Sequence, residues 1–213
     1  AHELARRGAR VLGLDRFEPP HALGSSHGGT HIIREAYYES PVYVPLVQDA
    51  YRRWAALERD CGRTLLHTTG ALTLGPPDGD VVRGARASVR AHGLAHAEFA
   101  ADETAARYPA LRVPAGFTAV LEHRAGALDA EGCHRALLDG ACTHGAELRY
   151  GDAVESWRAD GGGVAVATGD GVHRAGRLVL AAGGWLPALA PALAELLEVE
   201  RQVVVWTRPE GGR

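Results

Sequence analysis

The apolar and polar residues of the first third of the chain alternate in a way that predicts helices and short buried strands. Residues 3–7 have the pattern of a helix end that Gly8 closes, and residues 10–14 form an apolar run that ends at Asp15. Residues 43–60 carry apolar side chains at helical spacing. We therefore expect a helix that leads into a parallel strand, and later an amphipathic helix.

The same patterns predict further elements in the rest of the chain. The predicted helices cover residues 81–92, 102–108 and 130–144, and the predicted strands cover residues 30–34, 118–122 and, as a pair around Gly70, residues 65–74. After residue 147, turns separate predicted strands at 147–150, 154–158 and 164–167, and we expect the middle strands, 154–158 and 164–167, to form a small antiparallel meander. A buried strand at 177–181 should then run into a glycine turn and a short helix that extends to Leu196.

Composition limits the classes of function. The 213 residues carry a formal net charge of −3, so no basic field is available for nucleic acid or an anionic membrane. Glycine and proline interrupt the longest apolar stretches, so we expect no membrane helix. The three cysteines fit neither a disulfide framework nor a zinc site, and no signal peptide opens the chain. We expect a cytoplasmic protein with neither nucleic acid nor membrane as a partner.

Asp15 is the first candidate for chemistry. In a dinucleotide-binding βαβ unit, the second strand ends with an acid that accepts hydrogen bonds from the adenosine ribose, and Asp15 stands at the end of such a strand. The glycine-rich turn of that unit would precede Ala1. From these residues alone, an ordinary strand that ends in Asp is at least as good an interpretation.

The loop over residues 17–29 is the second candidate, and residues 24–31 read Gly-Ser-Ser-His-Gly-Gly-Thr-His. Glycines let backbone N–H groups approach a ligand, so this loop suits a phosphate or a polar ring edge, although a flexible surface loop has the same composition. His27 and His31 are four residues apart, but the two glycines between them disfavour a helix and no further ligand follows at a recognisable spacing. We predict no metal site.

Two further candidates follow predicted strands. Arg34 comes after two β-branched residues, and its planar guanidinium suits a carboxylate, but an ion pair with Glu35 or another acid is the simpler interpretation. Residues 179–185 form a small-residue turn after a parallel strand, where a backbone can approach a cofactor. The alternative there is an ordinary strand-to-helix turn with Trp185 in the core.

Taken together and in order, these segments resemble the monomeric sarcosine oxidase and N-methyltryptophan oxidase family of flavoproteins, which has a D-amino-acid-oxidase-like fold. The matching stretches are residues 11–21, 24–34, 43–46 and 178–185 with 201–204. The resemblance implies an α/β fold, with a Rossmann-like FAD-binding domain that contains a parallel sheet and a β-meander, plus part of a mostly antiparallel β substrate domain. The FAD-binding domain would comprise residues 1–70 and 125–200, and the substrate domain residues 71–124 and 201–213.

The resemblance also implies roles for single residues. Asp15 would bind the adenosine ribose with Arg16 beside it, and Arg34 would hold the substrate carboxylate, which reverses the simpler interpretations of Asp15 and Arg34. The other cofactor-binding residues would be Gly24, Ser25 and Thr30 along the flavin and pyrophosphate, Val154 at the adenine, and Ala181, Gly183 and Trp185 over the cofactor. His27 and His31 complete the candidate catalytic set.

Members of this family oxidise the C–N bond of a secondary amino acid such as sarcosine, with covalently bound FAD and with oxygen, to an imine and hydrogen peroxide. The resemblance therefore implies a secondary amino acid and oxygen as partners of a monomeric full-length protein. We expect this chain to be a fragment that is inactive alone. The glycine-rich loop would precede Ala1, and the oxygen-activating lysine, the flavin-linking cysteine and a second carboxylate-binding cation would follow Arg213.

His31 departs from the family pattern, which has an arginine beside the flavin. Histidine titrates at about pH 6.5, so it would stabilise an anionic reduced flavin less than arginine does. Two other functions stay open, namely a non-catalytic remnant that does not hold FAD and a nicotinamide-dependent dehydrogenase, since Asp15 suits NAD equally well. The loop over residues 24–34 has no evident role in a nicotinamide site, which argues against the dehydrogenase.

Overall fold

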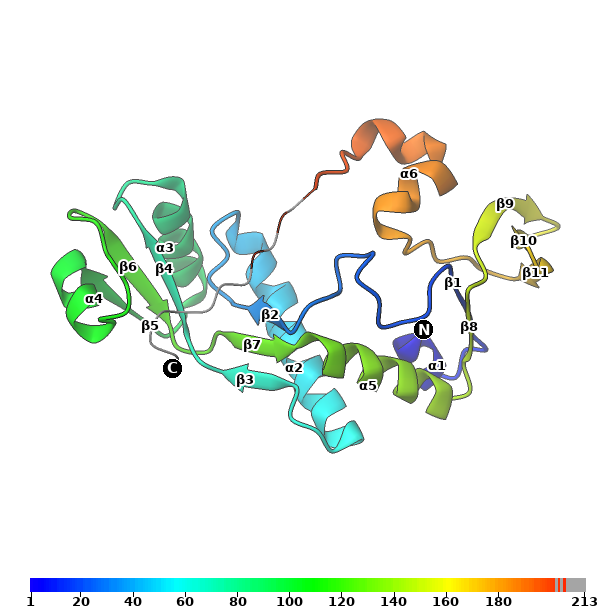
Figure 1. The fold of residues 1–213 in the computed structure, drawn as a ribbon, viewed down its shortest axis with the longest axis horizontal. Helices are drawn as coiled ribbons and strands as arrows, with labels where there is room; N and C mark the ends of the chain where they lie inside the picture. The colour runs from blue at the N-terminus through cyan, green and yellow to red at the C-terminus, as the bar shows by residue number, and fades with distance from the viewer. Residues whose placement is uncertain (202, 204, 206–213) are drawn as a thin grey trace. The chain divides into compact units, whose positions relative to one another are not determined.

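The structure is a computed structural model that describes residues 1–201, 203 and 205 (Figure 1). Its contacts divide the chain into two units, one of residues 1–13 and 26–147 and the other of residues 14–25 and 148 onward. Within the described residues, a parallel pair of strands, three antiparallel sheets and several helices confirm the predicted α/β class.

The first sheet of the first unit has the strand order β2-β7-β3, with β2 at Thr30–Ile33, β7 at Gly126–Asp129 and β3 at Leu66–Thr68. Both pairings are antiparallel. The helix α5 (Ala130–Thr143) contacts β2, β7 and the helix α2 (Val44–Cys61). One apolar core joins these elements and consists of Ile33, Tyr51, Leu57, Leu65, Leu128, Cys133 and Ala136.

Local sequence explains where the two long helices of this unit begin and end. A 3-10 turn, η1 (Pro41–Tyr43), leads directly into α2, and Gly62 closes α2 with a φ of +68° that favours glycine. Asp129 caps α5, because its side chain accepts a hydrogen bond from Gly132 N at 2.9 Å. The predicted boundaries of both helices hold to within one residue.

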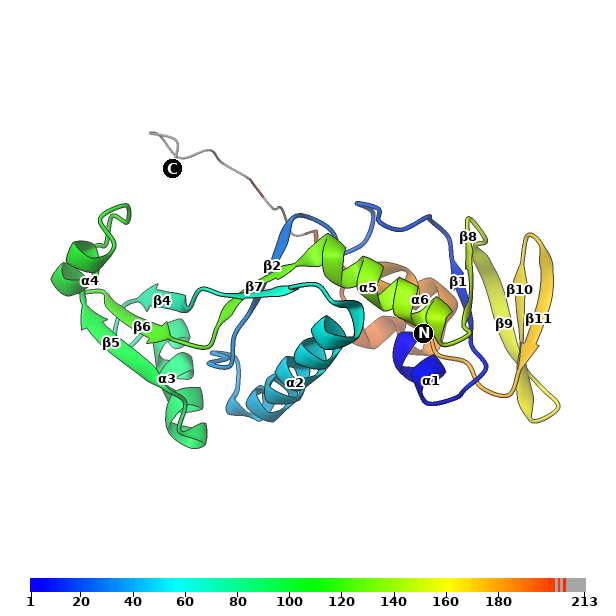
Figure 2. The same ribbon diagram turned by 90° about the horizontal axis from the view of Figure 1, so that it is seen from below.

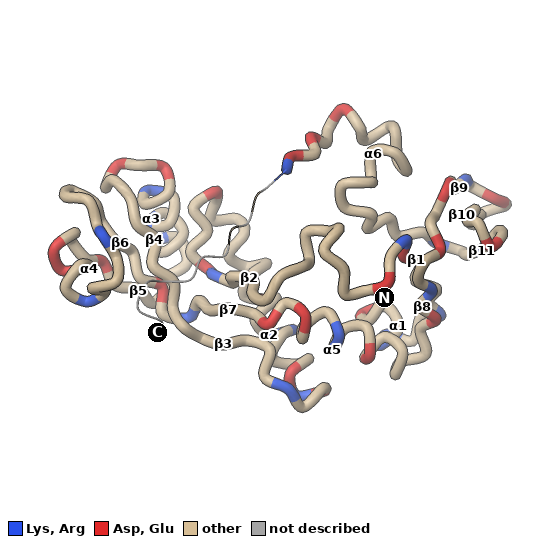
Figure 3. The backbone as a smooth tube through the Cα atoms, viewed as in Figure 1, with Lys and Arg blue, Asp and Glu red and all other residues tan. Residues whose placement is uncertain are grey.

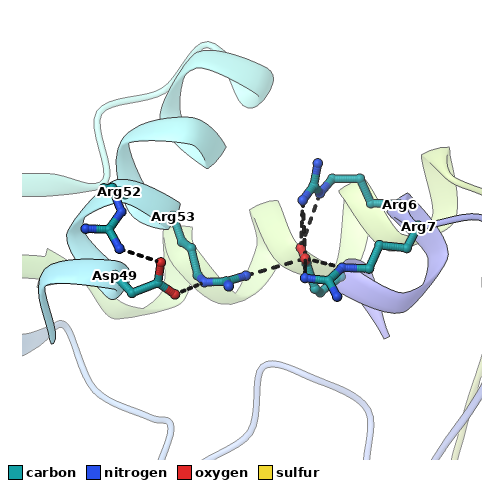
Figure 4. A network of polar contacts seen from close by, with 6 residues as sticks. Arg6, Arg7, Asp49, Arg52 and Arg53 are labelled. Carbon is teal, nitrogen blue, oxygen red and sulfur yellow. Dashed lines mark hydrogen bonds and ion pairs between the residues drawn. The ribbon is translucent and has the colours of Figure 1, made fainter. Parts of the chain in front are cut away.

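The short helix α1 (His2–Arg6) lies against α5 in both views of the fold (Figures 1 and 2). The two helices approach closely at Gly140, where a Cβ atom would lie 2.7 Å from His2 Cδ2. Exposed charges connect α1 to α2, since Arg53 Nη1 lies 3.4 Å from Glu3 Oε1 within the network drawn in Figure 4. Exposed ion pairs contribute little to stability. Ala5 is the residue of α1 that is buried.

The second sheet of the first unit has the order β4-β6-β5, with β4 at Ala71–Gly75, β6 at Thr118–Glu122 and β5 at His96–Ala100. The helix α3 (Asp80–His92) packs on β4 and β6, and α4 (Ala101–Arg107) packs on β5 and β6 (Figure 2). The core beside it consists of Ala36, Val44, Val82, Ala85, Val89, Leu94 and Val120. This sheet and its helices fall within residues 71–124, and the predicted domain bounds stay a prediction.

The chain passes between the two units within β1 (Leu12–Asp15) and β8 (Glu147–Tyr150), which pair in a two-stranded sheet. Val11 O accepts a hydrogen bond from Glu147 N, and Asp15 O accepts one from Asp152 N. Both segments therefore run in the same direction, as a parallel pair requires.

The second unit contains the antiparallel meander, with strand order β11-β10-β9. Its strands are β9 (Val154–Asp160), β10 (Gly163–Thr168) and β11 (Gly171–Ala175). Gly161 and Gly162 connect β9 to β10 with φ values of +57° and +88°, the conformation of a tight hairpin turn. The predicted meander is confirmed, and β11 adds a strand that the sequence pattern did not predict.

The strand predicted at residues 177–181 is wrong. No described residue forms a strand with this segment, and Val179 is 70% exposed. An apolar run becomes a strand only where a neighbour takes its backbone N–H and C=O groups, and β1 pairs with β8 alone among the described residues. The helical segment after it is present as η2 (Gly183–Trp185), α6 (Leu186–Leu189) and η3 (Pro191–Leu196).

The strand predicted at residues 30–34 exists as β2, but its predicted burial holds only in part. Ile33 is 8% exposed, whereas the neighbouring side chain, Ile32, points to the opposite face of this edge strand and is 75% exposed. His31 also lies on the surface. The parts of the predicted stretches at residues 202, 204 and 206–213 lie outside the described residues.

Charges of both signs are interspersed along the described chain (Figure 3). No helix in this part of the chain is long and apolar enough to cross a lipid bilayer. The described residues also contain no group of three or more His, Cys, Asp or Glu side chains arranged to hold a metal ion.

Candidate functional site

Asp15 ends β1 with a well-oriented carboxylate. Its Oδ1 accepts a hydrogen bond from Phe17 N at 3.0 Å and lies 4.0 Å from His21 Nε2, and its side chain is 44% exposed. Both contacts use the same oxygen, so among the described residues Oδ2 stays available to a ligand. Arg16 is exposed beside it, with Cζ 5.6 Å from the centre of the Phe17 ring.

Most of the predicted cofactor-binding residues lie in the same unit as Asp15. The hydrogen bond from Asp152 N to Asp15 O measures 3.2 Å and brings the start of β9 to the end of β1. The ring centres of Phe17 and Trp185 are 5.8 Å apart, which brings the loop after β1 to η2. The predicted residues in this unit are Asp15, Arg16, Gly24, Ser25, Val154, Ala181, Gly183 and Trp185.

The surface around η2 leaves room for a ligand. A Cβ atom added to Gly183 would meet no atom within 4 Å, and Ser25 and Ala181 are exposed. Trp185 is 41% exposed, so it is not the core residue of the alternative interpretation. An acid with a free oxygen, an uncovered glycine and an exposed aromatic ring suit a ribose, a phosphate and a flat ring, respectively, so these residues fit an adenine dinucleotide.

The other predicted residues, His27, Thr30, His31 and Arg34, belong to the first unit. His31 Nε2 lies 3.1 Å from His27 O, which orients the imidazole. A carbonyl oxygen only accepts hydrogen bonds, so Nε2 carries the proton in this contact. Thr30 is exposed and pairs with Asp129 across β2 and β7.

Arg34 follows β2 directly, and aromatic rings flank its guanidinium. Cζ lies 5.2 Å from the centre of the Tyr37 ring and 5.4 Å from that of Tyr38, which are cation–π distances. Its Nη2 lies 3.7 Å from Glu39 Oε1, which is too long for a hydrogen bond. Within the described chain, the guanidinium therefore keeps its N–H donors for a ligand such as a carboxylate.

The predicted ion pair of Arg34 with Glu35 or another acid holds only for another acid, since Arg34 Nη2 pairs with Glu39 Oε1 at 3.7 Å and not with Glu35. Glu35 is 3% exposed, and its Oε1 accepts a hydrogen bond from Arg124 Nη1 at 3.0 Å instead.

The sequence pattern missed three residues that contact the segment after Arg34, namely Glu122, Ser88 and Gly84. Glu122 is an acid at the end of an otherwise apolar strand, which was the one available signal of a buried carboxylate. Gly84 and Ser88 are small residues four apart on α3, and hence on one face of that helix. Their contacts depend on the tertiary fold, which local patterns do not report.

Comparison with known proteins places the chain in a class. Its whole length, residues 1–213, matches the FAD dependent oxidoreductase (DAO) family, and the chain belongs to this family. It is 38% identical over 212 residues to the monomeric sarcosine oxidase of Streptomyces avermitilis, and the matched region covers 100% of this chain and 55% of that protein. It is 32% identical over 206 residues to the N-methyl-L-tryptophan oxidase of Citrobacter koseri, with coverage of 97% and 55%. The chain thus spans about half the length of the curated relatives that it matches.

Solved structures agree with the fold. NikD, described as an unusual amino acid oxidase essential for nikkomycin biosynthesis, is similar with a TM-score of 0.81 and 30% identity over 90% of this chain and 49% of that chain. The glycine oxidase of Geobacillus kaustophilus gives a TM-score of 0.75 at 22% identity, over 91% and 54%, and so supports the fold alone. The predicted resemblance and the Rossmann-like fold class are confirmed.

Proposed function

We propose that the protein containing this chain oxidises the C–N bond of a small secondary amino acid, with FAD as cofactor and oxygen as electron acceptor, and releases hydrogen peroxide. The observation that carries the proposal is the guanidinium of Arg34, which two tyrosine rings flank and no acid engages by hydrogen bond among the described residues. It occurs in a chain that belongs to an FAD dependent family. The relatives are named for sarcosine and N-methyl-L-tryptophan, which both carry a carboxylate and a secondary amine.

The residues of the second unit would hold the cofactor. Asp15 Oδ2 would accept a hydrogen bond from a ribose hydroxyl, while the turn at Gly183 would let the backbone approach the phosphates. Trp185 would cover a flat ring of the cofactor with its exposed indole. The chemistry that bound FAD supplies is acceptance of a hydride equivalent from the substrate and its transfer to oxygen.

Arg34 and His31 of the first unit would position and polarise the substrate. Arg34 would bind the carboxylate with paired N–H groups, while Tyr37 and Tyr38 limit the motion of the guanidinium. Neutral His31 would present Nδ1 as an acceptor, because Nε2 donates to His27 O, and protonated His31 would present a second donor. This side chain would therefore stabilise negative charge only when it is protonated.

The cofactor is tested on the full-length protein that contains this chain. Its visible absorption spectrum is recorded before and after acid precipitation. Flavin bands that stay with the precipitate would support covalently bound FAD, and bands in the supernatant would support FAD without a covalent link. A protein without flavin bands would refute the proposal and favour the non-catalytic remnant.

The substrate is tested by oxygen consumption with sarcosine and other N-methyl amino acids. Arg34→Gln should raise KM for sarcosine about tenfold to a hundredfold, because a hydrogen bond to a charged group contributes about 1.5–3 kcal/mol. Arg52→Gln is the matched control, since the Arg52 side chain is 70% exposed on α2. Equal KM values for the two variants would contradict the assignment of Arg34.

A further inference from the structure

Glu122, the last residue of β6, is a buried acid whose two carboxylate oxygens both bind the backbone. Oε1 accepts a hydrogen bond from Glu35 N at 2.6 Å, Oε2 accepts one from Ala36 N at 2.7 Å, and the residue is 3% exposed. Hydrogen bonds to a charged acceptor are roughly twice as strong as neutral ones. These two bonds hold the peptide groups that directly follow Arg34.

The carbonyl groups of the same segment contact α3. Ser88 Oγ donates a hydrogen bond to Tyr37 O. A Cβ atom on Gly84 would lie 1.9 Å from Tyr38 O, so only glycine allows α3 to approach the segment this closely. Because α3 packs on β6, the groups that hold residues 34–38 belong to one layer of the fold. We call residues 34–38 the Arg34 segment.

Tyr51 of α2 binds Ile33, which precedes the Arg34 segment, and Arg124, which follows Glu122 by two residues. Its hydroxyl lies 2.9 Å from Arg124 O and 3.4 Å from Ile33 O, and it donates to these carbonyl groups. Burial, together with the negative charges of Glu122 and Glu35, raises the pKa of the phenol well above its ordinary value, so it stays a donor. Arg124 pairs with Glu35 and offsets one of the two buried negative charges.

We propose that Glu122 is the positioning residue for the carboxylate-binding arginine, a role that rests on the proposed function. Glu122 does not touch the substrate. It fixes the two peptide groups after Arg34, and so it sets the direction in which the guanidinium leaves β2 and the stacking of Tyr37 and Tyr38 beside it. Misplacement of a binding group by about 1 Å is enough to lower activity about a hundredfold, so a fixed backbone is a requirement of carboxylate binding.

The test compares two variants of the full-length protein that remove the same kind of interaction. In Glu122→Gln, the amide NH₂ faces one of the two backbone N–H donors, so one bond is lost and the segment shifts. In the control, Glu58→Ala, the lost carboxylate is one whose Oε1 accepts from both Leu65 N at 2.7 Å and Leu66 N at 2.9 Å, at the connection from α2 to β3, so its removal leaves these backbone donors without that acceptor. Unfolding temperature, kcat and KM for sarcosine, and the dissociation constant of acetate by calorimetry are measured for each.

We expect both variants to lose stability and only Glu122→Gln to bind carboxylates more weakly. Its KM for sarcosine and its acetate dissociation constant should rise about tenfold, with kcat at saturation changed less than about twofold, because a tenfold change corresponds to about 1.4 kcal/mol. An unchanged acetate constant in Glu122→Gln, or equal changes in both variants, would overturn the positioning role. If Glu122→Gln does not fold, Ser88→Ala is measured instead, because it loosens the same segment from α3. It should raise the KM for sarcosine and the acetate dissociation constant about threefold. If neither constant rises, the positioning role is overturned.

The acetate measurement separates this inference from the proposed function. A wild-type protein that binds acetate but oxidises neither sarcosine nor the other N-methyl amino acids would contradict the proposed function, while the acetate constants of the variants still decide the role of Glu122. A wild-type protein that does not bind acetate would overturn both.

Discussion

Substitution by alanine should lower the stability of the fold at one helical glycine, Gly84, but not at another, Gly140, because different atoms lie where the new Cβ would be placed. At Gly84 of α3, a Cβ would lie 1.9 Å from Tyr38 O and 2.7 Å and 2.8 Å from Tyr38 C and Cα, which are all backbone atoms. At Gly140 of α5, it would lie 2.7 Å and 2.8 Å from Cδ2 and Nε2 of the His2 ring. The His2 side chain can change its rotamer, whereas the Tyr38 backbone is held by α3 and β6.

The magnitude follows from two opposing terms. Alanine in a helix interior is favoured over glycine by about 0.8–1.0 kcal/mol, and this gain applies to both positions. At Gly84, relief of the overlap requires α3 to move more than about 1 Å away from a packed core, and overpacking of this kind costs about 1–3 kcal/mol or more. Because three backbone atoms crowd the Cβ at Gly84, the upper part of this range, about 2–3 kcal/mol, applies there. We therefore expect Gly84→Ala to lower the free energy of unfolding by about 1–2 kcal/mol and Gly140→Ala to leave it unchanged or raised by up to about 1 kcal/mol.

Urea denaturation measured by circular dichroism gives both values, and hydrogen exchange of the α3 amides localises the effect. Gly84→Ala should speed exchange in α3 and in the Arg34 segment, with α5 unaffected. A Gly84→Ala protein as stable as the wild type would refute the argument, because it would mean that α3 and the Arg34 segment do not approach as closely as described. Strong destabilisation by Gly140→Ala would show that His2 cannot move aside.

Two further predictions concern charge. In the full-length protein, His31→Arg should speed flavin reduction in stopped-flow measurements with sarcosine, because arginine is cationic at every working pH; an unchanged or slower rate would contradict the role of His31 beside the flavin. Glu98 of β5 binds Arg86 of α3 with Nη2 to Oε2 at 2.7 Å, and hydrogen bonding by Arg86 lowers the pKa of Glu98 from 4.5. Since the pKa is lower in the folded state, this pair stabilises the fold at pH values above 4.5, and the contribution is lost as the pH falls below that value. The difference in melting temperature between the wild type and Arg86→Gln should accordingly shrink on acidification, and a constant difference would show that Arg86 acts through packing alone.

The elements with strong local signals were predicted well. The helix α2 has apolar residues at helical spacing, and α5 has both this periodicity and the cap at Asp129. These are properties of contiguous residues, so they can be read from the sequence directly. The position of Asp15 at the end of β1 belongs to the same class, because it follows from the apolar run before it, whereas its role toward a cofactor stays a prediction.

Elements that depend on a distant partner were predicted poorly. The strands β5 and β7 are short and contain polar or small residues, and each exists because a strand from another part of the sequence takes its backbone hydrogen bonds. The reverse case is the segment 177–181, which has the apolar composition of a strand but lacks a strand partner among the described residues. The contacts around Arg34 also depend on a distant partner, because Glu122 accepts a hydrogen bond from Glu35 N across 87 positions of sequence.

The order of the chain also gives the Arg34 segment a place in folding. The residue itself lies near the start, but Ser88 binds Tyr37 from 51 positions later and Glu122 binds Glu35 from 87 positions later. A nascent chain that has completed α2 contains Arg34 and the flanking tyrosines but neither Ser88 nor Glu122, which hold the backbone of the Arg34 segment. Contacts of such long sequence separation form slowly because loop-closure entropy opposes them. Affinity for a carboxylate would therefore arise only when α3 and β6 are in place, and acetate binding would report on late tertiary folding of this unit.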